Sequence, residues 1–381
     1  MLNIKSEIKN KITKLKNIDS NEIEYVINDE LSKASIYTYI NPKDKLVLKD
    51  EILSEILGYG KIEKYIKDKS VSEIMINGIS NVFVERDGQI IETDLKLSYE
   101  EIDNIIEKIA SEVNKSISIA KPILDARLKD GSRVNVVGKP VALNGPIVTI
   151  RKFSNSLLNI DDLISNETIT SEVSNFLEYI VEKKYNIFIS GGTGSGKTTL
   201  LNIISNFINE DERVITIEDS AELKINNVKN IVTLETRDGN ANGENGITIR
   251  DLLITSLRMR PDRIIVGEVR GTETFDMLQA MNTGHEGSLS TGHANSSNDM
   301  LTRLESMVIM AYDLPLEAIK RQIASAIDII IHISRNEEGK RKVVEINQII
   351  NYSDGKYNIN KLFTYDYNKN KIIKVGNLIA K

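Results

Sequence analysis

The stretch that decides the fold is residues 190–200, SGGTGSGKTTL. It matches the phosphate-binding pattern G-x-x-x-x-G-K-[ST], in which backbone N–H groups surround phosphate oxygens. The pattern predicts that Lys197 contacts the phosphates and that Thr198 is a ligand of Mg²⁺. The residues expected to bind the nucleotide are Gly191, Gly192, Thr193, Gly194, Ser195, Gly196, Lys197, Thr198 and Thr199.

The residues on either side of this loop provide its structural context. Residues 186–190, NIFIS, form a short apolar run typical of a buried strand, and residues 199–208, TLLNIISNFI, have the apolar period of a helix. A strand, a glycine turn and a helix N-terminus suit anion binding, because the helix dipole and its unpaired N–H groups attract phosphate. The alternative is a flexible glycine loop that only connects a strand to a helix.

Composition and charge exclude several classes of protein. The 381 residues are enough for two or three domains. A formal net charge of −6 argues against a surface devoted to nucleic acid, and without cysteine there is no disulfide framework and no cysteine zinc site. No run approaches about twenty apolar residues, and no signal core begins the chain, so we expect a cytoplasmic protein. Association with a membrane surface through a partner stays open.

The first 45 residues are expected to form a helical segment. Apolar residues recur at helical spacing in residues 2–18, with lysines between them. Such a helix can lie on anionic lipid, but packing in a small helical bundle is the commoner outcome and is the prediction made here. A second helical pattern covers residues 23–36.

Residues 46–153 are expected to form a compact α+β domain, and the polar residues 154–170 a linker. Apolar alternation predicts strands, glycine turns predict a hairpin, and Ser98 is expected to cap a helix. The predicted elements are helices 46–57, 61–67 and 99–114, strand 73–76, a hairpin over 82–92, and strands 133–137 and 147–150.

From residue 171 to residue 381, strands and helices alternate. This alternation predicts an α/β fold with a mostly parallel sheet and helices on both faces, in which ligands bind at the carboxyl ends of the strands. A hairpin at residues 336–342, with strands reaching residues 350 and 362, is expected to form a C-terminal β appendage. The preceding strands are expected at residues 186–190, 213–218, 231–234, 263–268, 287–290 and 326–333.

Polar residues at three of these strand ends could carry nucleotide hydrolysis. Glu268 ends the apolar run RIIVGE as a single acid, with Gly267 where many P-loop enzymes carry aspartate, and could polarise the attacking water. Glu218, in VITIED, could reach water on the metal, or it could be an ordinary loop or cap acid. His293, in STGHAN, could contact the γ-phosphate, or it could be a loop histidine with its own hydrogen bond.

Several arginines gather along one stretch of the chain. A charge run is usually a solvated face, so some of them are expected to be surface or ion-pair residues. Planar guanidinium groups also suit phosphate recognition across a subunit boundary. The arginines concerned are Arg250, Arg258, Arg260, Arg263 and Arg270.

Four motifs occur together in a specific order: GGTGSGKTTL at 191–200, VITIEDSAEL at 214–223, TIRDLLITSLRMRPDRIIVGEVRG at 248–271, and MLQAMNTGHEGSLSTGHANS at 277–296. They resemble the Walker A box, Asp box, atypical Walker B box and His box of the secretion ATPase superfamily, the motors of type II and type IV secretion and of type IV pili. Upstream, VSEIMINGISNVFVERDG, PILDARLKDGSRVNVV and GPIVTIRKF resemble its tight-adherence (Tad/Flp, CpaF-like) pilus assembly ATPase branch.

The resemblance covers about residues 46–335 and implies both a fold and a site. The implied fold is a RecA-like P-loop NTPase domain, preceded by an α+β (PAS-like) N-terminal domain and an N-terminal helical segment. The implied cofactors are ATP and Mg²⁺. Carried over box by box, the resemblance gives roles to Lys197 and Thr198 (phosphate and Mg²⁺), Glu218 (Asp box), Glu268 (Walker B acid), His293 (γ-phosphate sensor), and Arg133 and Arg151 (nucleotide contacts from the N-terminal domain).

The resemblance also implies an assembly. It suggests a homohexamer on the cytoplasmic face of the membrane that acts on an inner-membrane platform protein and, through it, on pilin. The four-cysteine zinc site of the type II secretion and pilus-extension branches is missing, which favours the tight-adherence or type IV secretion branches. Two other functions stay open: a type IV secretion or DNA-transfer ATPase, and a nucleotide-gated assembly switch with little turnover.

Overall fold

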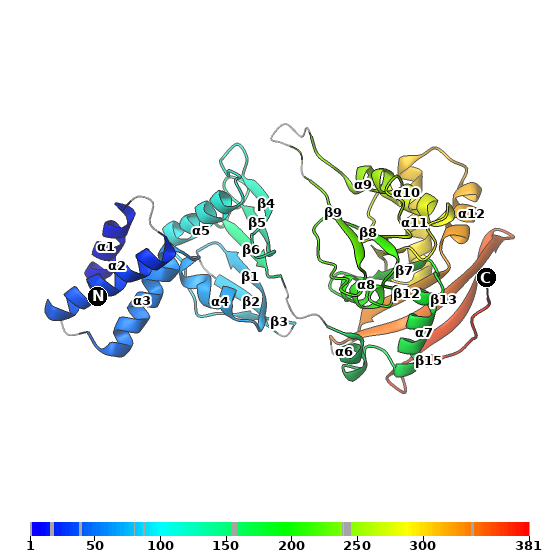
Figure 1. The fold of residues 1–381 in the computed structure, drawn as a ribbon, viewed down its shortest axis with the longest axis horizontal. Helices are drawn as coiled ribbons and strands as arrows, with labels where there is room; N and C mark the ends of the chain where they lie inside the picture. The colour runs from blue at the N-terminus through cyan, green and yellow to red at the C-terminus, as the bar shows by residue number, and fades with distance from the viewer. Residues whose placement is uncertain are drawn as a thin grey trace. The chain divides into compact units, whose positions relative to one another are not determined.

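The computed structural model describes residues 2–15, 19–37, 40–79, 81–86, 88–153, 158–237, 239, 245–336 and 339–380. The chain divides into two compact units, Met1–Ser156 and Leu157–Lys381 (Figure 1). No helix within the described ranges is both long and apolar enough to cross a membrane. The finer division predicted at residues 45, 153 and 170 stays a prediction.

The first three helices, α1 (Leu2–Thr13), α2 (Ser20–Tyr37) and α3 (Pro42–Ile56), pack as a bundle. Lysines of α1 pair with acids of the other two helices: Lys5 Nζ lies 2.7 Å from both Glu51 Oε2 and Glu55 Oε1, and Lys11 Nζ lies 2.7 Å from Glu30 Oε1. The bundle predicted for the basic helix is therefore confirmed, although residues 16–18 lie outside the described residues. The buried apolar residues of the bundle are Ile8, Ile12, Ile23, Ile27, Leu31, Leu48 and Ile52.

A lysine ties this bundle to the sheet domain that follows. Helix α3 is followed by Gly58, as predicted, and its last carbonyl groups need hydrogen-bond donors. Lys108 Nζ donates to Glu55 O and Gly58 O, each at 2.5 Å, and to Ile56 O at 3.3 Å. Burial lowers the pKa of Lys108. The ammonium group is thus the C-terminal cap of α3, where the helix dipole favours a cation.

In the described part of the first unit, six antiparallel strands form a sheet in the order β3-β2-β1-β6-β5-β4. Helix α5 covers one face, and its residues Ile102, Ile105 and Ile109 pack against the inward-facing strand residues. The predicted hairpin, helix and strands are all present, and β4 is an additional strand. The elements are η1 (Gly60–Ile62), α4 (Glu63–Lys67), β1 (Val71–Asn77), β2 (Asn81–Arg86), β3 (Gln89–Glu92), α5 (Tyr99–Glu112), β4 (Ile123–Arg127), β5 (Arg133–Val137) and β6 (Ile147–Arg151).

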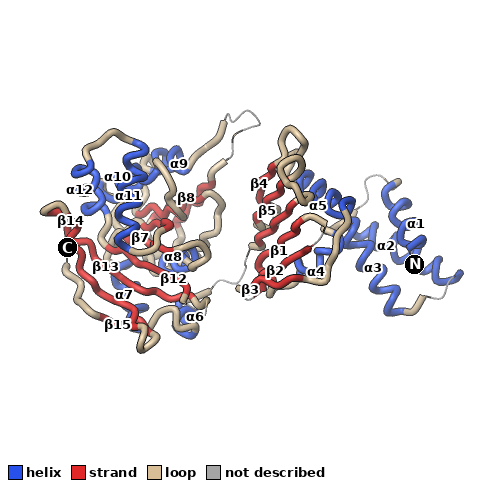
Figure 2. The backbone as a smooth tube through the Cα atoms, turned by 180° about the vertical axis from the view of Figure 1, so that it is seen from behind, coloured by secondary structure: helices blue, strands red, loops and turns tan. Residues whose placement is uncertain are grey.

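The second unit is built on one large sheet. Its described strands run in the order β15-β14-β13-β12-β7-β11-β10-β8-β9, and strands are drawn in red in Figure 2. Strands β7 to β12 are parallel, and β13 to β15 continue the sheet antiparallel. The strands are β7 (Ile187–Gly191), β8 (Arg213–Glu218), β9 (Asn230–Glu235), β10 (Arg263–Val266), β11 (Leu289–His293), β12 (Ile329–Arg335), β13 (Arg341–Ser353), β14 (Lys356–Asp366) and β15 (Lys371–Lys374).

Helices cover both faces of this sheet, as the alternating pattern predicts. Ile187 and Ile189 of β7 face the core shared with α6 to α8, whereas Phe188 faces the core shared with α9 to α12. The helices are α6 (Ile160–Ser165), α7 (Ser171–Glu182), α8 (Lys197–Ser205), α9 (Ile249–Ser256), α10 (Glu273–Asn282), α11 (Ser297–Ala311) and α12 (Leu316–Ala326).

This is the predicted RecA-like fold, with four local differences from the sequence prediction. Helix α6 lies inside the expected linker, and Leu163 and Ile169 are buried in the core of the second unit. The strand expected at 287–290 extends to His293, and the strand expected at 326–333 begins after α12 has ended at Ala326. Strands β13 to β15 lengthen the main sheet instead of forming a separate appendage. The carboxyl ends of β7, β11, β10 and β8 therefore meet at one edge.

Candidate nucleotide site

The glycine loop between β7 and α8 exposes backbone rather than side chains. Gly194 and Gly196 have φ angles of 68° and 100°, which favour glycine, and α8 begins directly after the loop at Lys197. A Cβ added at Gly191 would lie 2.3 Å from Ile333 O, so no side chain fits there. Ser195 Oγ is buried and finds no hydrogen-bond partner among the described residues. Exposed N–H groups, a helix N-terminus and an unsatisfied hydroxyl group fit a bound phosphate chain.

Lys197 lies folded over this loop. Its Nζ donates to Gly191 O at 3.1 Å and to Gly192 O at 2.9 Å, and it lies 3.3 Å from His293 Nδ1. Burial lowers the pKa of Lys197, and the charge of Glu268 opposes this shift. Because an ammonium group can only donate, Nδ1 of the histidine accepts, and the ring proton is placed on Nε2.

The neighbouring strands bring a histidine and an acid to the same point. His293 is opposite Gly191 in the β11–β7 register, and Glu268 follows β10 on the next strand. His293 Nε2 lies 2.8 Å from Glu268 Oε1, although the approach is outside hydrogen-bond geometry, and Arg270 Nη2 donates to Glu268 Oε2 at 2.7 Å. Burial lowers the pKa of His293, which favours the neutral ring. The order Lys197, His293, Glu268, Arg270 forms a continuous polar chain that begins at the loop.

Glu218 is held differently. It is only 3% exposed, and its Oε1 accepts hydrogen bonds from the backbone N–H groups of Glu222 at 3.0 Å and Leu223 at 3.2 Å. Its Cγ lies 2.9 Å from where a Cβ of Gly267 would be. The carboxylate therefore secures the loop after β8, and this packing explains why position 267 has no side chain. A role of Glu218 at the metal stays a prediction.

Arg133 and Arg151 belong to the sheet of the first unit. They lie directly opposite each other on β5 and β6, and Arg151 is also opposite Glu73 on β1. Burial raises the pKa of Glu73, and the charge of Arg151 opposes this shift. A nucleotide contact from these two arginines stays a prediction.

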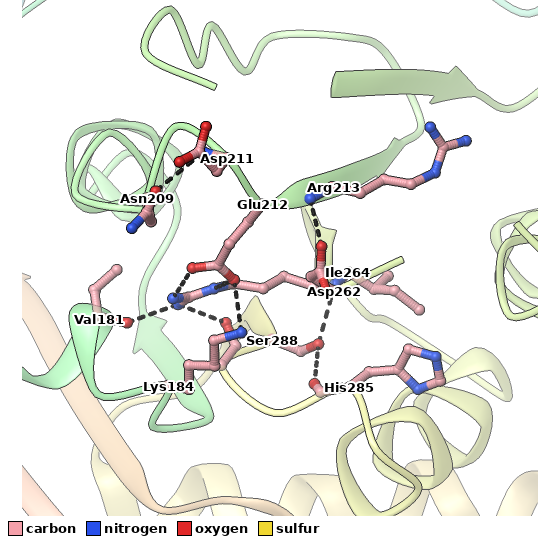
Figure 3. Close-up of polar contacts among 12 residues, drawn as sticks. Val181, Lys184, Asn209, Asp211, Glu212, Arg213, Asp262, Ile264, His285 and Ser288 are labelled. Carbon is pink, nitrogen blue, oxygen red and sulfur yellow. Dashed lines mark hydrogen bonds and ion pairs between the residues drawn. The ribbon is translucent and has the colours of Figure 1, made fainter. Parts of the chain in front are cut away.

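Arg263 is one of the arginines of this cluster that form an ion pair, as expected for some of them. Its side chain is 0% exposed, and Nε and Nη2 donate to the two carboxylate oxygens of Glu212, each at 2.8 Å. Figure 3 shows the Glu212 carboxylate with Lys184 and Val181 nearby. Nη1 donates to Val181 O, and Lys184 Nζ lies 3.1 Å from Glu212 Oε2. Burial would raise the pKa of Glu212, but Arg263 lowers it overall. Because Arg263 begins β10, at the edge opposite the glycine loop, it stabilises the fold and contacts no phosphate there.

The sequence interpretation missed two other arginines. Arg335 ends β12 and Arg341 begins β13, and their Nε atoms donate to the same acceptor, Gly194 O, at 3.1 and 3.2 Å. The sequence predicted the hairpin at 336–342 but gave no sign that its arginines contact the glycine loop. Charged residues at the tip of a hairpin usually face solvent.

Comparison with known proteins identifies the family of this chain. The family described as "Type II/IV secretion system protein" matches residues 55–365, most of the chain. The chain belongs to this family. The predicted secretion ATPase superfamily is thereby confirmed, whereas the tight-adherence branch stays a prediction.

Individual relatives place the chain within the family. An uncharacterized protein of Methanocaldococcus jannaschii is 43% identical over 295 residues, which are 74% of this chain and 40% of that protein. The conjugal transfer protein TrbB of Rhizobium radiobacter is 32% identical over 295 residues, 77% of this chain and 88% of TrbB. The crystal structure of the pilus retraction motor PilT with bound ADP matches with a TM-score of 0.55 at 23% identity, over 77% of this chain and 83% of PilT. At that identity the likeness to PilT concerns the fold alone.

Proposed function

We propose that this protein is a Mg²⁺-dependent ATPase that powers a type IV pilus or secretion machine. The observation that carries the proposal is the polar chain from the glycine loop through Lys197 and His293 to Glu268. Three neighbouring parallel strands, β7, β11 and β10, bring these groups to one edge of the sheet. Membership of the secretion family supports the same assignment.

Each residue has a specific role in the proposed reaction. The loop N–H groups and Lys197 bind the phosphates and offset charge that develops during phosphoryl transfer. Thr198 provides the hydroxyl oxygen that, with the phosphates, would hold Mg²⁺, and this ion supplies charge stabilisation when bound. Glu268 orients and deprotonates the attacking water, with Arg270 fixing its carboxylate. His293, neutral and donating from Nε2, responds to the γ-phosphate next to Glu268.

The proposed assembly is a homohexamer on the cytoplasmic face of a membrane. ATP turnover would move the two units relative to each other, with Arg133 and Arg151 coupling the first unit to the nucleotide. The motion would act on an inner-membrane platform protein and so on pilin, as in tight-adherence pili. The upstream motifs at residues 71–88, 122–137 and 145–153 support this finer assignment.

Steady-state phosphate release by the full chain with MgATP tests the activity. Lys197→Ala is expected to reduce release to background by removing phosphate binding. Glu268→Gln is expected to lower kcat by about 10²- to 10⁴-fold while nucleotide still binds. The matched controls are Lys229→Ala and Glu210→Gln, which alter an exposed ion pair and should leave release unchanged. Wild-type turnover in Lys197→Ala or Glu268→Gln would refute the site. Binding with negligible wild-type turnover, even with a platform-protein fragment added, would favour the assembly switch.

A second candidate function is a DNA-transfer motor, because TrbB is described as a conjugal transfer protein. The formal charge of −6 weighs against DNA binding by the chain itself. Phosphate release measured with and without single- and double-stranded DNA distinguishes the two. We expect no stimulation, and a rise in turnover of several-fold at physiological salt would favour DNA transfer.

A further inference from the structure

A row of three polar residues crosses the sheet next to the glycine loop: Ser190 on β7, His332 on β12 and Glu345 on β13. Ser190 directly precedes Gly191 and is 0% exposed, and its Oγ lies 2.8 Å from Nδ1 of the buried His332. Burial lowers the pKa of His332, which favours the neutral ring. His332 is directly opposite Ser190 in one register and directly opposite Glu345 in the other. The start of the glycine loop is therefore joined through β12 to β13.

Glu345 extends this row to the beginning of α11. Its Oε1 accepts a hydrogen bond from the backbone N–H of Ser297 at 2.8 Å, and its Oε2 accepts one from Asn347 Nδ2 at 3.1 Å. Burial would raise the pKa of Glu345, but the hydrogen bonds from Ser297 and Asn347 lower it overall. Ser297 is the first residue of α11, where unpaired N–H groups and the helix dipole favour an anion. Glu345 thus fastens the N-terminus of α11 to β13.

The beginning of α11 lies close in the chain to His293. This histidine is the last residue of β11, and residues 294–296 are all that separate it from Ser297. Its Nδ1 lies 3.3 Å from Lys197 Nζ, and its Nε2 lies 2.8 Å from Glu268 Oε1. The end of a strand opens more easily than its middle, and groups at a reaction centre have to be held to within about 0.5 Å. The position of the ring therefore depends on how firmly the start of α11 is held.

The antiparallel part of the sheet holds α11 at a second place. The hydroxyl group of Tyr357 on β14 donates to Glu305 Oε1 at 2.9 Å. Glu305 lies about two helical turns, or about 12 Å, beyond Ser297 along α11. Both hydrogen bonds join the same part of the sheet to the same helix, but only the one made by Glu345 lies next to His293. Comparing them separates the positioning of His293 from the general stability of α11.

We propose that Glu345 is a positioning residue for ATP hydrolysis, which keeps His293 in place by holding the N-terminus of α11. The proposal rests on the proposed function, since His293 is the residue assigned there to respond to the γ-phosphate. Glu345 acts through His293, so its loss should lower kcat while the loop N–H groups, Lys197 and Thr198 still bind nucleotide. Such a change weakens binding of the transition state more than binding of the ground state.

Phosphate release and equilibrium binding of fluorescent MgADP, both with the full chain, test the proposal. Glu345→Met removes the acceptor of the Ser297 N–H group and keeps a side chain of similar length. We expect kcat to fall by about ten- to hundredfold, as for reacting groups misplaced by up to about 1 Å, with MgADP affinity within about threefold of wild type. Glu345→Gln keeps an oxygen acceptor and should recover most of kcat. Tyr357→Phe is the matched control, which should lower the melting temperature and leave kcat unchanged.

A double variant tests whether Glu345 acts through His293. In a His293→Ala background, Glu345→Met should lower kcat by less than about twofold, because residues that act as a unit have non-additive effects. If the two substitutions instead lower kcat by independent factors that multiply, Glu345 does not act through His293 and the proposal is overturned. Retained MgADP binding shows that each variant is folded.

The remaining outcomes separate this proposal from the proposed function. If wild type releases no more phosphate than Lys197→Ala, the proposed function fails, and the positioning role fails with it. If wild type turns over and Glu345→Met keeps its kcat, only the positioning role fails. It also fails if Tyr357→Phe loses as much kcat as Glu345→Met, which would indicate that turnover follows the stability of α11. Turnover in Glu345→Gln as slow as in Glu345→Met would count against the hydrogen bond to Ser297 as the cause.

Discussion

Replacing Gly267 with alanine tests whether Glu218 packs against the backbone directly after β10. The added Cβ would lie 2.9 Å from Glu218 Cγ, whereas carbon atoms pack at about 3.5–4.0 Å, so Glu218 must move by about 0.6 Å or more. The carboxylate cannot move freely, because it is buried and accepts hydrogen bonds from Glu222 N and Leu223 N. Overpacking of this kind costs about 1–3 kcal/mol. For a unit the size of Leu157–Lys381 that is a fall in melting temperature of about 2–12 °C.

Thermal unfolding followed by circular dichroism, together with phosphate release, measures this effect. Gly267→Ala should melt earlier and turn over more slowly, since the displaced Glu218 loosens the loop after β8. In an Glu218→Ala background the same substitution should cost much less, because the clash is gone. Gly271→Ala is the matched control, since its added Cβ would meet only the flexible end of Glu273, at 3.3 Å. Equal losses with and without the Glu218 side chain, or no loss at all, would refute the packing argument.

Three further predictions concern other parts of the chain. Arg263→Met removes both arginine hydrogen bonds of the Glu212 carboxylate and leaves it only Lys184 as an ion-pair partner among the described residues, so it should cost about 3–5 kcal/mol in urea unfolding. Most of this loss should be recovered by Arg263→Met/Glu212→Leu, and equal stability of the single variant and wild type would contradict the prediction. Since burial lowers the pKa of His293 below 6.5, the folded protein binds fewer protons than the unfolded chain. Turnover and stability should therefore decline only below about pH 6.5. In His293→Asn the fall in turnover at acid pH should disappear. An unchanged pH–rate profile would show that His293 does not cause this fall. Lys108→Met leaves the last carbonyl groups of α3 without their donor and should lower the free energy of unfolding by about 1–3 kcal/mol in chemical denaturation. The control Lys67→Met, at an exposed lysine, should leave it unchanged. Equal effects of the two substitutions would argue against the cap.

Short-range sequence patterns predicted the glycine loop and the alternation of strands and helices in the second unit. The glycine loop with its flanking strand and helix could be recognised from residues 186–208 alone, and the alternation that follows is also set by short-range periodicity. The extra helix α6 was missed because its six residues lie in a polar stretch with turn-forming residues. Its burial depends on Leu163 and Ile169 meeting helices and strands much later in the chain. Such packing leaves no periodic signal at the site itself.

The site was predictable to the extent that it follows from strand order. Parallel strands end at a common edge, so His293 and Glu268 could be expected near Lys197 without any coordinates. The sequence could not distinguish Glu218 at the metal from Glu218 as a loop acid, because both require a carboxylate at the same strand end. Its backbone partners depend on the path of residues 219–223. For a related reason the sequence could not tell which of the clustered arginines forms an ion pair: the partner of Arg263, Glu212, precedes a different strand.

The direction in which each strand leaves the sheet explains why one side of the loop could be predicted and the other could not. Strands β11 and β10 stop at the carboxyl edge, so only residues within a few positions of their ends, such as His293 and Glu268, can reach the loop. Strand β12 instead turns back into β13, and the long side chains of Arg335 and Arg341 reach Gly194 O from this hairpin. A strand-end rule finds the first kind of residue and overlooks the second.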